Sequence, residues 1–267
     1  MEALCFDIKA PFASFRVPST TRGFLTFPFP PRTTILGLIG GILGIDRNKI
    51  YLEDHPLNDL EVSLIMMRMP QTNNLRTNQI QTKSVITYGG KFKLYLPKRF
   101  IRGTEAPLRS PQTLVFLRDV HYRVLVSITD KNKKMMEELE LRLKQHKYVY
   151  TPYLGRANYL ASLDFIDRVE LNLIENINEE HRMASLCATN DVITIKSGEF
   201  TIITNVPMAY NAIEDRKKGI LLEPAVLANI IYFSQSINII PKQELYEIIK
   251  TDISSLKNQK ILFLPFK

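Results

Sequence analysis

The spacing of apolar residues changes several times along the first two thirds of the chain, and this limits the possible folds more than any other feature. Alternation at every second position predicts strands over residues 3–10, 60–69, 114–128 and 160–171, and helical spacing predicts helices over 31–43 and 130–146. A long polar excursion separates the second and third strands. The resulting order is strand, helix, strand, excursion, strand, helix, strand, which is the split β-α-β, ferredoxin-like plan of RNA-recognition modules. The predicted fold class is therefore α+β.

The strands over residues 3–10 and 114–128 each carry an apolar and a polar face, which predicts half-buried strands. Arg118 falls on the apolar face of the second of these, so a bulge or a strand start is expected near it. His121 shares the polar face with Asp119 and Arg123. That face either touches RNA or forms a salt-bridged sheet surface, and the sequence leaves both open.

The first predicted helix begins near Pro31 and is unusually rich in glycine. Each interior glycine costs about 0.8–1 kcal/mol of helix propensity relative to alanine, a cost tolerated where a backbone closely approaches another element. We therefore expect the face with Gly37 and Gly41 to pack against a neighbour. The segment lacks the glycine patterns of phosphate-binding loops, although the helix N-terminus, with Arg32, could hold a phosphate.

Positive charge is concentrated in one part of the chain. Residues 65–125 contain 11 Lys or Arg against 2 Asp or Glu, whereas the whole chain has a net charge of +8. Clustered positive charge on a protein attracts and binds a polyanion, and nucleic acid is the commonest polyanionic partner. The alternative is a loop kept soluble by charge, but such loops usually mix both signs. The pattern favours nucleic-acid binding.

The last third of the chain has weaker patterns. Strands over 192–196 and 200–204 flank Ser197-Gly198, which predicts a hairpin. A mostly apolar run predicts a helix over 221–233, entered through Pro224. A final amphipathic helix is predicted over 241–257.

Several function classes are excluded by composition and spacing. Cys5 and Cys187 lie far apart without cysteine or histidine neighbours at ligand spacing, so neither a disulfide framework nor a metal site is expected. No cofactor motif is present. The longest apolar run, 35–45, is too short to span a bilayer, and the start has no secretory-signal pattern. We expect a protein of the reducing cytoplasm that has no membrane partner.

Three blocks of sequence carry a family resemblance. They are FDIKAPFASFR at residues 6–16, FPPRTTILGLIG at 29–40 and TPYLGR at 151–156. In this order and spacing they resemble the CRISPR-associated RAMP-superfamily "Cas five" family, the subunit that caps the 5′ handle of the guide RNA (crRNA) in type I Cascade. Composition and the loop after the second helix look more like the I-B or I-A branch than the I-C branch.

The resemblance implies an architecture and a set of partners. It implies a ferredoxin-like RAMP domain over 1–172, with a β-hairpin thumb in the basic excursion at about 71–111, and a smaller β-rich C-terminal domain over 173–267. It implies a non-catalytic RNA-binding role in antiviral defence, with contacts to the crRNA 5′ handle and to the Cascade backbone and large subunits. Target DNA would be met only indirectly, through the complex.

Basic residues in this context are the candidate RNA contacts. A guanidinium group can bind a phosphate with two hydrogen bonds or stack on a base, whereas lysine mainly adds to the positive electrostatic potential. For any single residue, a solvated surface charge is the alternative. The candidates are Arg16, Arg22, Arg32, Arg68, Arg76, Lys83, Lys91, Lys93, Arg99, Arg102, Arg109 and Arg156.

RNA cleavage is the alternative function. In the I-C branch the corresponding subunit cuts precursor RNA without metal, using a tyrosine, a lysine and a histidine, the last two near the start of the second helix. The corresponding stretch here, 131–134, has lysines but no histidine. His146, with Lys144 and Tyr148, is the best substitute set, although the helix dipole alone also favours a histidine at a helix end. We expect no catalytic activity.

Overall fold

A central antiparallel sheet organises the N-terminal part of the computed structural model, which describes residues 1–18, 25–50, 55–68, 79–87, 109–175, 178–215, 219–233 and 236–265. Strand β1 (Glu2–Ala13) lies between β6 (Arg109–Ile128) and β7 (Ser162–Ile174), and β4 (Val62–Arg68) pairs with the other side of β6. The order β7-β1-β6-β4 is the one that a β-α-β-β-α-β chain gives when its first strand enters the middle of the sheet. The predicted sequence of these strands is confirmed.

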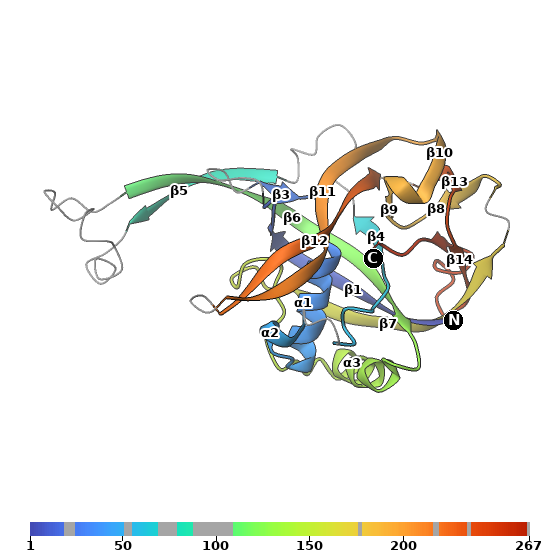
Figure 1. Ribbon diagram of the computed structural model, residues 1–267, viewed down its shortest axis with the longest axis horizontal. Helices are drawn as coiled ribbons and strands as arrows, with labels where there is room; N and C mark the ends of the chain where they lie inside the picture. The colour runs from blue at the N-terminus through green and yellow to red at the C-terminus, as the bar shows by residue number, and fades with distance from the viewer. Residues whose placement is uncertain are drawn as a thin grey trace, which may run out of the picture.

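Two helices cover one face of this sheet (Figure 1). They are α1 (Arg32–Leu43) and α3 (Lys133–Gln145), and both lie where the apolar spacing predicts them. Leu4, Phe6 and Ile8 of β1 enter the core beneath the helices. Ala3 and Cys5, on the opposite face, are also fully buried, in a second apolar cluster. β1 is therefore covered on both faces along this half, and the expectation of a half-buried strand is wrong there.

The C-terminal strands extend the same sheet. From β7 outward the order is β14 (Leu245–Lys250), β15 (Lys260–Ile261), β8 (His181–Met183), β13 (Ile237–Pro241) and β10 (Val192–Ser197). A shared apolar cluster runs from β1 to the last strands. The expected β-rich character of the C-terminal part is confirmed. The division at residue 172 stays a prediction, because sharing one sheet does not decide which segment folds alone.

A second sheet packs beside α1. It contains the long hairpin of β11 (Phe200–Asp215) and β12 (Gly219–Phe233), with β9 (Cys187–Ala188) next to β12. Small elements complete the described chain: β2 (Phe15–Arg16) paired with β3 (Thr26–Phe27), the short helix α2 (Arg47–Ile50) and a 3-10 turn, η3 (Thr189–Asp191). Overall the described chain is mostly β, with its helices gathered on one side.

Three predictions for the C-terminal part are wrong. Residues 221–233 lie in strand β12, and the segment 241–257 contains strand β14 in place of a helix. Ser197-Gly198 does not form a hairpin, because β10 pairs with β13 while β11 pairs with β12 in the other sheet. Both misassigned runs are rich in isoleucine and leucine, which fit a strand buried by its neighbours as well as a helix.

The glycines of α1 behave differently from the prediction. A Cβ on Gly41 would have no atom within 4 Å, and Gly37 and Gly41 line an open groove instead of packing against an element. The close approach is at Gly40, where a Cβ would lie 2.4 Å from Cδ1 of Ile50. Gly44 ends the helix in the left-handed region at φ 77°.

The N-terminus of α3 has Asn132 at its N-cap position. Its amide bridges the turn, since Oδ1 accepts from the backbone N–H of Thr129 at 2.8 Å and Nδ2 donates to the carbonyl of Ser127 at 3.1 Å. Met136, Leu139 and Leu143 of this helix are buried. Among the described residues, no helix is both long enough and apolar enough to cross a membrane.

Candidate nucleic-acid interface

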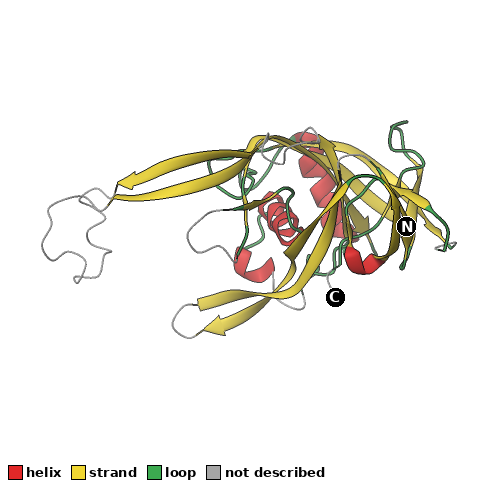
Figure 2. Cartoon of the chain, turned by 90° about the horizontal axis from the view of Figure 1, so that it is seen from above, coloured by secondary structure: helices red, strands yellow, loops and turns green. Residues whose placement is uncertain are grey.

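A two-stranded arm projects from the sheet and carries part of the basic segment (Figures 1 and 2). Strand β5 (Gln79–Thr87) pairs antiparallel with the first half of β6, from Gln79 opposite Leu117 to Thr87 opposite Arg109. The predicted projecting hairpin is therefore present in the described backbone. Lys83 lies in β5 and Arg109 begins β6. The candidates that lie outside the described residues are Arg22, Arg76, Lys91, Lys93, Arg99 and Arg102.

The arm leaves the sheet at a backbone irregularity. Asp119 has a φ of 52°, in the left-handed region that residues other than glycine rarely adopt. On β6 the buried face passes from Val120 to Leu117 across this point, and on the partner strand it passes from Ala10 to Ala13. Both strands therefore exchange their inward and outward faces where the arm begins. The bulge or strand start predicted near Arg118 is not found, because β6 runs through Arg118 without a break and its register with β1 does not shift there; the irregularity is the backbone conformation of Asp119.

Three aromatic rings gather at the root of the arm. Phe12 meets Phe116 edge-to-face with ring centroids 5.4 Å apart, and Tyr159 lies 6.1 Å from each of them. Phe12 is exposed, and its partner across the sheet is the exposed Arg118. Sequence reasoning missed this group because its three members come from segments far apart in the chain.

Three of the predicted arginines lie near the surface. Arg16 in β2 and Arg68 at the end of β4 are exposed, and Arg156 is half-buried. Arg156 follows Gly155, which closely approaches the end of β1: a Cβ there would lie 1.7 Å from the carbonyl oxygen of Ser14. The backbone N–H of Ser14 also donates to the carbonyl of Leu154 at 3.2 Å. The first and third sequence blocks are therefore fixed against each other.

Arg32 is not an RNA contact in this structure. Its side chain is 1% exposed, and its guanidinium donates to the carbonyls of Leu60, Asn58 and Met208 at 2.5–3.2 Å. A buried guanidinium must have its donors satisfied, and backbone carbonyls do so here. Arg32 therefore joins α1 to the second sheet and leaves the set of candidate RNA contacts.

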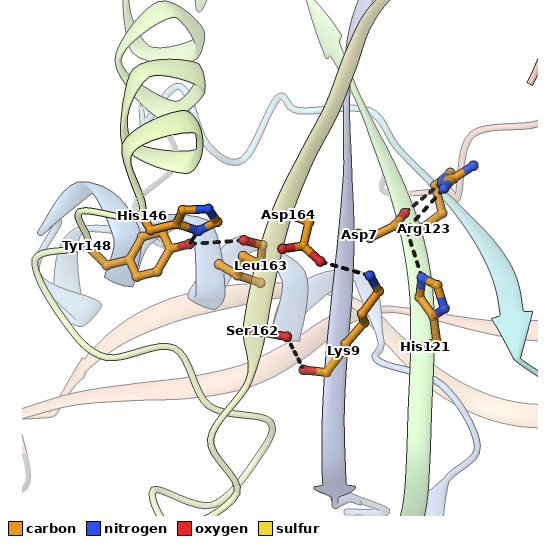
Figure 3. Close-up of polar contacts among 9 residues, drawn as sticks. All are labelled: Asp7, Lys9, His121, Arg123, His146, Tyr148, Ser162, Leu163 and Asp164. Atoms are coloured by element: carbon orange, nitrogen blue, oxygen red, sulfur yellow. Dashed lines mark hydrogen bonds and ion pairs between the residues drawn. The ribbon is translucent and has the colours of Figure 1, made fainter. Parts of the chain in front are cut away.

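The histidine on the polar face of β6 belongs to an ion-paired cluster (Figure 3). Asp7 accepts two hydrogen bonds from Arg123, at 2.7 and 3.0 Å, and lies 2.8 Å from Nε2 of His121. Burial alone would raise the pKa of Asp7, but the hydrogen bonds from Arg123 and His121 outweigh it and hold the pKa below its ordinary value. Of the two alternatives for this face, the structure has the salt-bridged one.

Comparison with known families decides the identity of the chain. A sequence profile described as "CRISPR-associated protein (Cas_Cas5)" matches residues 3–207, which is well over half of the protein. The chain belongs to the Cas5 family of CRISPR-associated proteins. The resemblance carried by the three sequence blocks is thus confirmed for the family, while the I-B or I-A subtype stays a prediction.

Two solved structures similar to this Cas5 family member are distant in sequence. A chain of a "CRISPR RNA-guided surveillance complex" is 15% identical, with 90% of this chain and 91% of that chain covered and a TM-score of 0.46. A CRISPR protein from Archaeoglobus fulgidus is 11% identical over 98% of both chains, with a TM-score of 0.48. No curated protein matches significantly. Because both TM-scores lie below 0.5, the family assignment rests on the profile.

The substitute catalytic set of this Cas5 family member is only partly assembled (Figure 3). Nδ1 of His146 lies 3.1 Å from the hydroxyl of Tyr148, which donates to the carbonyl of Leu163 at 3.1 Å. Burial, followed by the negative charge of Asp164, raises the pKa of Tyr148, so less of its phenolate, the form that could accept a proton, is present near neutrality. Lys144 is paired with Glu140 at 2.6 Å and does not join the other two.

In the part of the chain that the structure describes, no group of three or more His, Cys, Asp or Glu side chains is placed to hold a metal ion. Both cysteines are buried, and burial raises the pKa of each thiol to about 12. A thiol with so high a pKa is a poor nucleophile near neutral pH.

Proposed function

We propose that this Cas5 family member is a non-catalytic RNA-binding subunit of a type I CRISPR surveillance complex, Cascade, and that it caps the 5′ handle of crRNA. The observation that carries the proposal is the basic segment 65–125, whose described part includes an arm that continues strand β6 beyond the sheet. An arm that projects from a rigid sheet can reach a polyanion without disturbing the core. In this role the protein also contacts the backbone and large subunits.

The affinity for RNA should fall strongly with salt, and most of this salt dependence should come from arginines of the basic segment. For single strands the slope of log affinity against log salt is about −0.7 per phosphate neutralised. Replacing Arg76, Arg99 and Arg102 with alanine should flatten this slope by up to roughly 2 units. Anisotropy titrations of a single-stranded RNA carrying the repeat-derived handle, at several salt concentrations, measure it.

The matched control removes the same formal charge from the tail by changing Arg216, Lys217 and Lys218 to alanine. It should matter less, because Glu214 and Asp215 already offset that charge. Equal losses in both triple variants would mean that only net charge counts. Equal affinity for handle RNA and for duplex DNA of the same length would argue against handle recognition.

The second candidate function is a metal-independent endoribonuclease, which the contact between His146 and Tyr148 favours. Purified protein should leave repeat RNA uncut with or without EDTA, and His146→Ala should keep RNA binding within a few-fold. Specific cleavage that this substitution abolishes would establish the nuclease instead.

A further inference from the structure

An open groove runs along α1 and is lined by residues of α1, α2, β11 and the loop 150–155. It has a volume of about 830 Å³, within the range of roughly 300–1,000 Å³ that is usual for ligand sites. Its floor includes Gly37 and Gly41 of α1, its outer wall is the loop 150–155, and Tyr210 of β11 closes one side. Figure 1 shows α1 beside the β11–β12 hairpin, which supplies that side.

The walls of the groove are held in place by main-chain contacts. The backbone N–H groups of Val149 and Tyr150 donate to the carbonyls of Ile42 and Gly41, at 3.2 and 3.1 Å. The other end of the loop is fixed where Gly155 meets Ser14. The groove is therefore built before any ligand arrives, which lowers the ordering cost of binding. The absence of a side chain at Gly41 leaves its floor open.

Two large aromatic side chains stay exposed at this groove. Tyr150 is 60% exposed and Tyr153 is 47% exposed, although both come from the loop that the main chain holds rigidly. Exposed aromatic rings that share a concave site are characteristic of binding surfaces. Single-stranded nucleic acid uses such rings as stacking platforms, because every base has a π-face.

The charge of the groove indicates which part of a nucleic acid it would take. None of its described lining residues is lysine or arginine, and Asp46 adds an acidic group. Such a groove disfavours phosphate and suits the uncharged bases. The phosphates have cationic candidates close by in the chain, since Arg156 directly follows Gly155.

We propose that this groove binds unpaired bases of single-stranded RNA by stacking them on Tyr150 and Tyr153. The inference rests on the proposed function, because it names the part of the RNA that this part of the protein takes. In this arrangement the arm and the surface arginines bind the phosphates of the RNA, and the groove binds its bases. A peptide segment of another subunit is the competing occupant, but nothing in the groove supplies the open strand edge or the continuous apolar stripe that peptides commonly use.

The test compares a short mixed-sequence single-stranded RNA with an abasic ribose-phosphate strand of the same length. Both are titrated into the full chain by fluorescence anisotropy. The wild-type protein should prefer the RNA by about fivefold or more for each base that stacks. The double variant Tyr150→Leu, Tyr153→Leu should lose most of this preference, while its affinity for the abasic strand and its salt slope stay unchanged.

Three further variants separate stacking from misfolding. Phenylalanine at both tyrosines should keep the preference, because the rings remain. Gly41→Leu should remove it by filling the groove, and the open space around Gly41 should let this variant fold. Leu141→Ala, an equally exposed site on α3, should change nothing. In wild-type protein, photo-crosslinks from 4-thiouridine RNA should map to residues 150–153.

Each contrary outcome has a separate meaning. Equal binding of RNA and abasic strand by wild type would overturn the groove proposal and leave the proposed function standing. Failure to bind either strand would count against the proposed function itself. If the tyrosine variants keep the base preference but lose association with another Cascade subunit, the groove is a protein-docking site and the proposal is wrong.

Discussion

Arg32 and Asp191 are both buried and ionisable, and they differ in how their polar atoms are paired. Arg32 donates to three backbone carbonyls from two segments of the chain, so each nitrogen of its buried guanidinium has a hydrogen-bond partner. Asp191 is 6% exposed, and its Oδ2 has no hydrogen-bond partner among the described residues. Burial raises the pKa of this carboxyl to about 6. One residue stabilises the junction of the two sheets, and the other destabilises it when ionised.

Asp191→Asn should therefore stabilise the protein near pH 8. The folded pKa of Asp191 lies above the unfolded value of 3.8, so stability falls as the pH rises from about 4 to about 6 and stays lower above that. Asparagine removes the charge and should add about 1–3 kcal/mol to the free energy of unfolding at pH 8. Chemical denaturation at pH 8 and pH 4 measures the difference, which should shrink at the lower pH.

The exposed Asp130 provides the control for this prediction. Asp130→Asn should change stability by less than about 0.5 kcal/mol at either pH. A destabilised Asp191→Asn at pH 8 would mean that the ionised carboxylate has a stabilising partner.

At the scale of the element, α1 has one glycine that its neighbours require and one that they do not. Gly40 faces Ile50 of α2, and a Cβ there would also lie 3.7 Å from Leu57. Gly41 lies on the next position of the same helix but faces the groove. The two sites have the same local sequence context, so only their tertiary surroundings separate them.

Gly41→Ala should stabilise the protein by about 0.8–1 kcal/mol, because it gains helix propensity and meets no neighbour. Gly40→Ala gains the same propensity but must displace the side chain of Ile50, so its melting temperature should lie below that of Gly41→Ala. Thermal melts of the two variants side by side check this. The opposite order would mean that the packed face of α1 is the one with Gly41.

At the scale of the whole molecule, the C-terminal strands complete the sheet that the N-terminal segment begins. β14 pairs with the free edge of β7, and Ile248 and Phe263 cover Val169 and Leu171. The β11–β12 hairpin meanwhile supplies a carbonyl to Arg32 and one wall of the groove. Both the arm and this hairpin extend from the same side of the body (Figure 2).

A fragment ending at residue 172 should therefore be insoluble or lack a cooperative melt. It would expose the edge of β7 and uncover one apolar face of the sheet, both of which promote aggregation. Expression of residues 1–172 beside the full chain, followed by thermal melts of the soluble fractions, measures this. A soluble fragment with a cooperative melt would support an independent N-terminal domain.

The sequence by itself was sufficient for the features that local pattern controls. Alternation and helical spacing predicted the strands and helices of the first part, because these periods depend only on near neighbours. The long polar excursion and the family resemblance predicted the projecting hairpin, and the three blocks identified the family. Tertiary structure alone decided the rest. Residues 221–233 became a strand because β11 and β9 lie beside them, and Arg32 became buried because Met208, far along the chain, accepts from it. The groove likewise exists because main-chain bonds bring a loop against the side of α1 that carries Gly41. Such pairings join residues distant in sequence, and no local pattern records them.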